Sequence, residues 1–132
     1  MAKLTILVHA SPDVEEHARF AFELAKAAAA GGHHAVLFGL GDGAYLADAR
    51  LSQGRRAGIV KEVREYLEKQ AAVAEGGADG SGAGRLEVLT CSLSAEERGL
   101  EGDGLIPGAR VSSTVNLGRL LGESDKSIFL VP

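Results

Sequence analysis

The chain has 132 residues, of which 45% are hydrophobic and 24% are charged, and this balance is typical of one globular domain spanning residues 1–132. Its formal net charge is -4 with acids and bases interspersed, and no basic stripe carries interleaved aromatic residues, so we expect no direct contact with nucleic acid. No apolar run approaches the roughly 18 residues of a membrane span, and residues 1–10 lack the pattern of a signal peptide, so we expect no membrane partner.

Strand and helix patterns alternate along the first part of the chain. Residues 4–9 form a nearly continuous apolar run rich in β-branched side chains, which predicts a strand covered on both faces. Residues 11–13 supply a serine cap, a proline and an acid, as helix starts commonly do, and apolar residues recur at helical spacing up to Gly31. Residues 34–38 predict a second strand, and residues 39–43 predict its exit loop.

The rest of the chain continues this alternation. Apolar residues at helical spacing across 59–71 predict a second long helix, and the glycine-rich segment 76–84 predicts a flexible connection. The later predicted elements are a strand at 86–90, a short helix at 94–98, an extended piece at 109–111, a helix capped by Ser112 or Ser113 and a last strand at 127–131. The pattern predicts an α/β fold: a three-layer α/β/α domain whose mainly parallel sheet has about five strands.

Cys91, the only cysteine, lies where the third predicted strand ends and a helix begins. The carboxyl ends of parallel strands are where α/β folds place ligands, and the free amides of a helix N-terminus stabilise a thiolate. Ser92 follows at once, Ser94 with Glu97 matches the spacing of a capping box, and Arg98 is a cation that a short helix can fold back toward the thiol. We therefore expect an exposed, partly ionised and reactive thiol, although composition alone favours a small buried apolar residue.

The cysteine count also bears on the cellular compartment. A single thiol cannot form an internal disulfide, so we expect the protein to work in a reducing cytoplasm.

Histidines provide one further candidate for the site. His9 ends the first predicted strand and is the best candidate for an acid–base or orienting role beside the thiol. His33 and His34 are adjacent at the start of a strand and point to opposite faces, so they cannot chelate one ion together. Since no further cysteine or acid cluster completes a ligand set, we predict no metal.

Residues 39–44 loosely fit the glycine fingerprint of dinucleotide-binding folds. That fingerprint belongs to the first strand–helix turn, whereas this segment follows the second strand, and in a chain with 18 glycines such a match is close to chance. No Gly-x-x-x-x-Gly-Lys-Ser/Thr loop is present either. We predict no cofactor, and keep as an alternative a small-ligand or nucleotide-binding domain that uses Ser11, Asp13 and residues 39–43.

The block Thr90-Cys91-Ser92-Leu93-Ser94-Ala95-Glu96-Glu97-Arg98-Gly99-Leu100 resembles the DsrE-like sulfur-relay family, which includes the TusD-type proteins. That family similarly pairs a cysteine at a strand end with Arg-Gly seven and eight residues later, here Cys91 with Arg98 and Gly99. The resemblance continues through residues 105–109 and 124–130 and extends to the loop 42–46 and the first strand–helix unit. It covers most of the chain, and its specific part is the C-terminal third.

The resemblance implies a function as well as a fold. Cys91 would accept sulfane sulfur from a donor protein as a persulfide and pass it to the thiol of an acceptor protein, while Arg98 and Gly99 shape its loop. Some family members carry a second cysteine three positions after the first, where this chain has Ser94, so a single-thiol relay is implied. Family members commonly assemble as trimers or hexamers, which implies a homo-oligomer, or a hetero-oligomer with related subunits.

An alternative of a different class remains open from the same resemblance. Relay complexes contain related subunits that carry no sulfur, so this chain could be a non-catalytic assembly subunit of a DsrE-type complex. Whether the protein is an enzyme, acting as a sulfurtransferase-like persulfide carrier, depends on the reactivity of Cys91.

Overall fold

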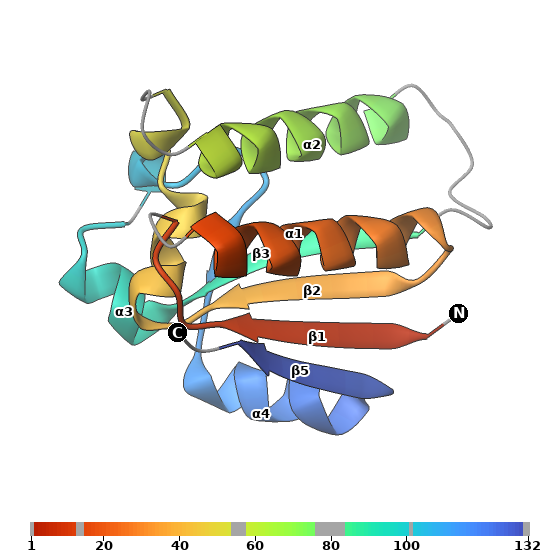
Figure 1. Cartoon of the computed structure of the whole chain (residues 1–132). Coiled ribbons are helices and arrows are strands. Elements are labelled where there is room, and N and C mark those ends of the chain that lie inside the picture. The colour runs from red at the N-terminus through yellow and green to blue at the C-terminus, as the bar shows by residue number, and fades with distance from the viewer. Residues whose placement is uncertain (1, 13–14, 54–57, 76–83, 101, 131–132) are drawn as a thin grey trace.

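Five parallel strands form one sheet in the order β4-β3-β2-β1-β5 (Figure 1). The computed structural model describes residues 2–12, 15–53, 58–75, 84–100 and 102–130. The strands are β1 (Lys3–Val8), β2 (His34–Gly39), β3 (Arg85–Cys91), β4 (Arg110–Ser112) and β5 (Lys126–Leu130). The parallel sheet of five strands predicted from the alternating pattern is therefore confirmed.

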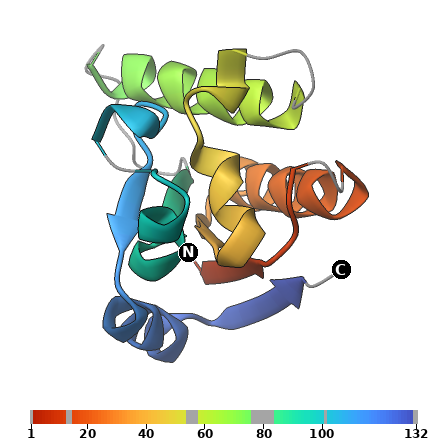
Figure 2. The ribbon, with the colours of Figure 1, turned by 90° about the vertical axis from the view of Figure 1, so that its left-hand side faces the viewer.

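Helices cover both faces of the sheet, as the three-layer prediction requires. Figure 1 shows α1 (Glu15–Ala30) and α2 (Gly58–Glu75) on one face and α4 (Thr114–Glu123) on the other. The short helix α3 (Ser92–Glu97) and the 3-10 turn η1 (Gly41–Ala47) lie at the carboxyl edge of the strands, which Figure 2 views end-on. The short turns η2 (Leu51–Gln53) and η3 (Gly102–Gly104) complete the regular structure. Because every strand runs in the same direction, all strand exits meet at this one edge.

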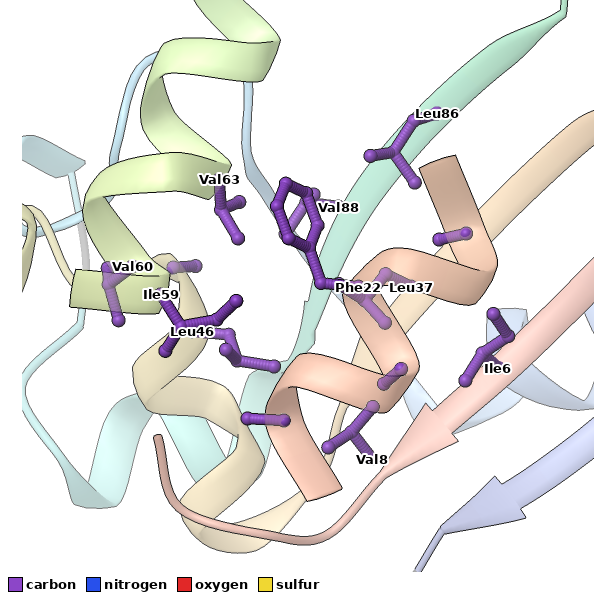
Figure 3. Close-up of a cluster of buried hydrophobic side chains, with 14 of the residues drawn as sticks. Ile6, Val8, Phe22, Leu37, Leu46, Ile59, Val60, Val63, Leu86 and Val88 are labelled. Carbon is purple, nitrogen blue, oxygen red and sulfur yellow. The ribbon is translucent and has the colours of Figure 1, made fainter. Parts of the chain in front are cut away.

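Two apolar cores explain why the strands read as nearly continuous hydrophobic runs. Figure 3 shows the larger core, in which Phe22 of α1 packs with Leu37, Leu86 and neighbours from α2. In β1, Ile6 and Val8 point into this core, while Leu7 points to the opposite face, under α4. The smaller core beneath α4 consists of Leu7, Val36, Phe38, Leu89, Cys91, Leu117 and Leu120. Burial on both faces is the usual environment of parallel strands.

Several predicted boundaries shift by a few residues. The first described helix begins at Glu15, so Ser11 does not lie directly before it, and Asp13 falls outside the described residues. The short helix starts at Ser92, two positions before the predicted start, with Cys91 as its cap. Of the two predicted caps of α4, Ser113 takes the role: its hydroxyl accepts a hydrogen bond from the amide of Asn116 at 3.0 Å.

The glycine-rich segment predicted as a flexible connection lies outside the described residues from 76 to 83. Its last residue, Gly84, is described, and a Cβ there would sit 2.0 Å from the carbonyl oxygen of Ala29. A side chain does not fit at this entry to β3, so glycine is required for packing. Within the described ranges, no helix is both long and apolar enough to cross a membrane.

Candidate functional site

The thiol of Cys91 sits at the junction of β3 and α3. Cys91 is the last residue of β3 and the N-cap of α3, with φ -58° and ψ 129°. Its side chain packs in the core beneath α4, together with Leu89 and Leu117, and only 6% of the residue is exposed. The expectation of a solvent-exposed thiol is therefore wrong for the single chain. Strand alternation explains the difference, since it turns Cys91 toward the face that α4 covers.

The surroundings of the thiol nevertheless favour its ionised form. Burial raises the pKa of Cys91, but the amide and hydroxyl of Ser94, the amide of Leu93 and the hydroxyl of Thr114 lower it by more, so the net shift is downward. The side chain makes no standard capping hydrogen bond. The net lowering of the Cys91 pKa comes from several nearby donors at the helix N-terminus, which stabilise negative charge on sulfur.

Ser94 connects the thiol to the neighbouring loop. Its hydroxyl oxygen accepts a hydrogen bond from the amide of Gly41 at 2.8 Å. The same hydroxyl lowers the pKa of Cys91 by hydrogen bonding to its sulfur. A hydroxyl can accept one hydrogen bond and donate another, so the Gly41 amide, the Ser94 hydroxyl and the sulfur form one polarised chain. Ser94, chosen from the sequence as a capping residue of α3, instead joins α3 to η1.

His9 lies on the other side of the same glycine. A Cβ at Gly41 would come within 2.8 Å of the His9 ring, so the ring rests directly against this loop. The His9 side chain is exposed, and its backbone amide donates to the carbonyl of Leu130 at 3.0 Å. The structure thus brings His9, Gly41, Ser94 and Cys91 to one edge of the sheet, with Gly41 and Ser94 between the imidazole and the sulfur.

Arg98 does not fold back onto the thiol as the sequence suggested. Its guanidinium donates to Asp42 Oδ1 at 3.0 Å and to the carbonyl of Ser94 at 3.1 Å, and it lies 5.7 Å from the centre of the Tyr45 ring. These contacts attach α3 to η1, and the two elements lie side by side in Figure 2. Arg98 therefore joins η1 to α3, the helix that carries Ser94, and the groups that lower the pKa of Cys91 are hydrogen-bond donors.

The other two serines chosen from the sequence are not among the groups that shift the pKa of Cys91. Ser92 is the first residue of α3 and is half-buried. Ser11 is half-buried two residues after His9. Thr114, whose hydroxyl lowers the pKa of the Cys91 thiol, is a site residue that sequence reasoning missed. Its only sequence signal is its place after the Ser113 cap, and the contact depends on how α4 crosses the sheet.

The glycines at 39–43 serve close packing of the backbone. A Cβ at Gly43 would lie 1.9 Å from the carbonyl oxygen of Val8, and one at Gly39 would lie 2.5 Å from the carbonyl of Gly43. Gly41 has a φ of +54°, which L side chains rarely adopt. The pattern that resembled a nucleotide fingerprint thus reflects a tight turn pressed against the end of β1.

The two adjacent histidines have separate protein partners. His33 Nδ1 accepts a hydrogen bond from the Ala2 amide at 3.0 Å, whereas His34 Nε2 lies 2.6 Å from Glu87 Oε2. In the part of the chain that the structure describes, no group of three His, Cys, Asp or Glu residues is placed to hold a metal ion.

The fold and the site together define a small parallel α/β protein with one thiol at the carboxyl edge of its sheet. The YchN protein of E. coli has the same fold, with a TM-score of 0.69 at 19% identity over 98% of this chain and 100% of that one. MTH1491 of Methanobacterium thermoautotrophicum, described as a protein of unknown function, gives a TM-score of 0.61 at 15% identity over 98% and 100% of the two chains. At these identities the likeness establishes the fold alone. No curated protein matches the chain.

A family model places the chain more closely. The model of the DsrE/DsrF-like family matches residues 2–130, so the chain belongs to this family, whose members generally act in sulfur relay. The resemblance drawn from the block around Cys91 is thereby confirmed.

Proposed function

We propose that this protein is a sulfur-relay protein that carries sulfane sulfur on Cys91 as a persulfide. The observation that carries the proposal is the place of Cys91 at the N-terminus of α3, where nearby donors lower its pKa and favour the thiolate, the nucleophilic form of cysteine. Family membership supports the same reaction class.

The transfer is a pair of balanced displacements. The Cys91 thiolate attacks the outer sulfur of a donor persulfide, a new S–S bond forms on Cys91, and the donor cysteine leaves as a thiolate. An acceptor thiolate then attacks the outer sulfur of the Cys91 persulfide, and Cys91 leaves as a thiolate in turn. The donors around Ser94 would stabilise the anion at both stages. With one cysteine in the chain, donor and acceptor must both be other molecules.

Loading of Cys91 is tested by mass spectrometry of the intact protein. After incubation with a persulfide donor that loads a known carrier, we expect the wild type to gain the mass of one sulfur atom, which a reductant removes. Cys91→Ser should gain none, and Ser92→Ala should load like the wild type. A wild-type protein that stays unmodified under these conditions contradicts the proposal.

The low exposure of Cys91 favours a second candidate, a non-catalytic assembly subunit. The two candidates differ in the reactivity of the native thiol. A relay protein should be alkylated in the folded state within minutes by a small haloacetamide, whereas an assembly subunit should react only after denaturation.

Under either candidate we propose that the protein works in the cytoplasm as an oligomer. The oligomer would be a trimer or hexamer of this chain, or a complex with related subunits. Light scattering of the purified protein tests the homomeric form.

A further inference from the structure

A cavity of about 230 Å³ lies on the face of the sheet that α4 covers, beside β3 and β4. Its lining includes Leu89 and Leu120 from the core beneath α4, together with polar residues of four elements. Cys91 is not among the lining residues, so the cavity is separate from the thiol site.

Three cationic side chains line this cavity. Lys3 of β1, Arg110 of β4 and Arg119 of α4 come from distant parts of the sequence and converge here. The two arginine side chains are 63% and 61% exposed, so an incoming solute can reach them. In a chain of net charge -4, this gathering of positive charge indicates a site for negative charge.

Glu87 is the one carboxylate in the lining, and its oxygens are already occupied. Oε2 pairs with His34 at 2.6 Å, while Oε1 pairs with Arg110 and lies 3.5 Å from Arg85. Burial raises the pKa of Glu87, but the His34 hydrogen bond and the charges of Arg85, His34 and Arg110 lower it by more. The ionised Glu87 carboxylate therefore holds Arg110 in place, and the neighbouring cations balance its negative charge.

On the opposite wall two cations share one carboxylate. Glu123 accepts from Lys3 at 3.2 Å and from Arg119 at 2.9 Å, and Asn116 Oδ1 accepts from Arg119 at 2.6 Å. The nearby carboxylate of Asp125 accepts from the backbone amide of Lys3 at 2.7 Å. An ammonium has three N–H donors and a guanidinium has five, so these contacts leave donors of both cations for a ligand.

A hydroxyl adds a neutral donor to the set. Ser112 Oγ accepts from the amide nitrogen of Asn116 at 2.5 Å, which leaves its own proton to donate to a ligand. Asn116 is held in turn by Arg119, so the polar groups that line the cavity position one another.

We propose that this cavity binds a small oxyanion: a sulfur or phosphorus oxyanion, or the carboxylate of a small organic acid. Guanidinium forks match the paired oxygens of these groups. The volume is below the roughly 300 Å³ at which pockets for drug-sized ligands begin, so the occupant should be a small ion or acid. The site goes beyond the proposed sulfur transfer and does not require it, although Ser112 pairs with Cys91 across β3 and β4 and brings the cavity close to the thiol.

The proposal is tested by titrating the full-length protein with sodium sulfate, thiosulfate, phosphate and acetate at constant ionic strength. Chloride is the background ion, and amide NMR shifts are the readout. We expect saturable shifts at Ser112 and Asn116 with at least one oxyanion, and the ranking of the four salts identifies the ligand class. Cys91→Ser should bind equally well, which separates this site from the relay chemistry.

Two matched variants make the result specific. Arg119→Gln should weaken binding by about five-fold or more, because a charge-assisted contact is lost. Lys61→Gln removes the same charge from the exposed surface of α2, across the sheet, and should bind as the wild type does. Failure of every salt to saturate, or equal weakening by the two variants, overturns the proposal. Melting temperatures confirm that both variants are folded.

Discussion

Ser94 shows how one side chain sets the chemistry of another. Its oxygen accepts a hydrogen bond from the Gly41 amide, and its hydroxyl lowers the pKa of Cys91. The turn η1 and the helix α3 therefore both contribute to the acidity of the thiol. This position is where some family members carry a second cysteine. In this chain a hydroxyl takes that place and stabilises an anion without offering a second sulfur.

Removal of the Ser94 hydroxyl should make the thiol less acidic. In Ser94→Ala we expect the pKa of Cys91 to rise, because one of the groups that lower it is lost. The rate at which a small alkylating agent modifies Cys91 increases as the thiol ionises. The midpoint of the plot of rate against pH should therefore move to higher pH in the variant. The rates should be measured between about pH 6 and 10, a range that contains the ordinary thiol pKa.

Ser92→Ala is the matched control, since the same change occurs two residues earlier, on the half-buried first residue of α3. Its profile should overlay that of the wild type. A Ser94→Ala midpoint that is unchanged or lower would show that the hydroxyl does not stabilise the thiolate.

The structure brings together some of the predicted residues and adds one that the sequence did not indicate. Cys91, Ser94 and His9 lie at one edge of the sheet because parallel strands exit at the same edge, and strand ends can be predicted locally. Thr114 was missed because its contact depends on the path of α4. Arg98 was given the wrong partner, since only the structure places Asp42 and Tyr45 beside it.

At the scale of elements, the loop after β2 is pressed against β1. The backbone of Gly43 lies so close to the Val8 carbonyl that a Cβ would approach to 1.9 Å. Real Cβ atoms do not make such a contact with a carbonyl oxygen, so any side chain must displace the turn. The edge that carries the candidate site therefore depends on this glycine.

Gly43→Ala should destabilise the protein by at least about 3 kcal/mol, because the clash is with backbone that cannot rotate away. Gly118→Ala is the control for the same chemical change in the interior of α4, where a Cβ meets nothing within 4 Å. The control should be stabilised by roughly 0.5–1 kcal/mol through its helix propensity. Urea unfolding of both variants measures the difference, and a Gly43→Ala protein as stable as the wild type would refute the packing argument.

Element types were more predictable than element order. All five strands and the three long helices follow from periodicity, because burial on two faces or on one helical stripe leaves a clear pattern. Boundaries shifted where caps were ambiguous: the α3 cap is Cys91, which local preferences do not favour. The order β4-β3-β2-β1-β5 depends on contacts between distant segments, and no local pattern encodes it.

On the scale of the whole molecule, the two faces of the sheet are covered unequally. One face carries α1 and α2, whereas the other carries the ten-residue helix α4, with Leu117 and Leu120 as its buried residues (Figure 1). Val115 and Leu121 of α4 are exposed. Less apolar surface therefore holds α4 to the sheet than holds α1, which buries Phe22 and four alanines.

Hydrogen exchange should reveal this inequality. We expect the amides of α4 to exchange by local opening, with protection at least about ten-fold below that of the α1 and β2 amides, because few buried contacts oppose the opening. NMR exchange at neutral pH measures both sets in one sample, and β2 serves as the internal reference. Equal protection of α4 and β2 would mean that α4 opens only when the whole chain unfolds.

The position of Thr114 and Ser94 around a nearly covered sulfur has a further consequence. The hydroxyls that lower the pKa of Cys91 belong to α3 and α4, and α4 also covers the side chain of Cys91. Any displacement of α3 or α4 that admits a reactant also withdraws part of this support, so accessibility and nucleophilicity oppose each other within one chain. A partner protein that contributes its own N–H or O–H groups would restore the lost stabilisation, so sulfur transfer to such a partner should be faster than transfer to a small thiol of the same pKa.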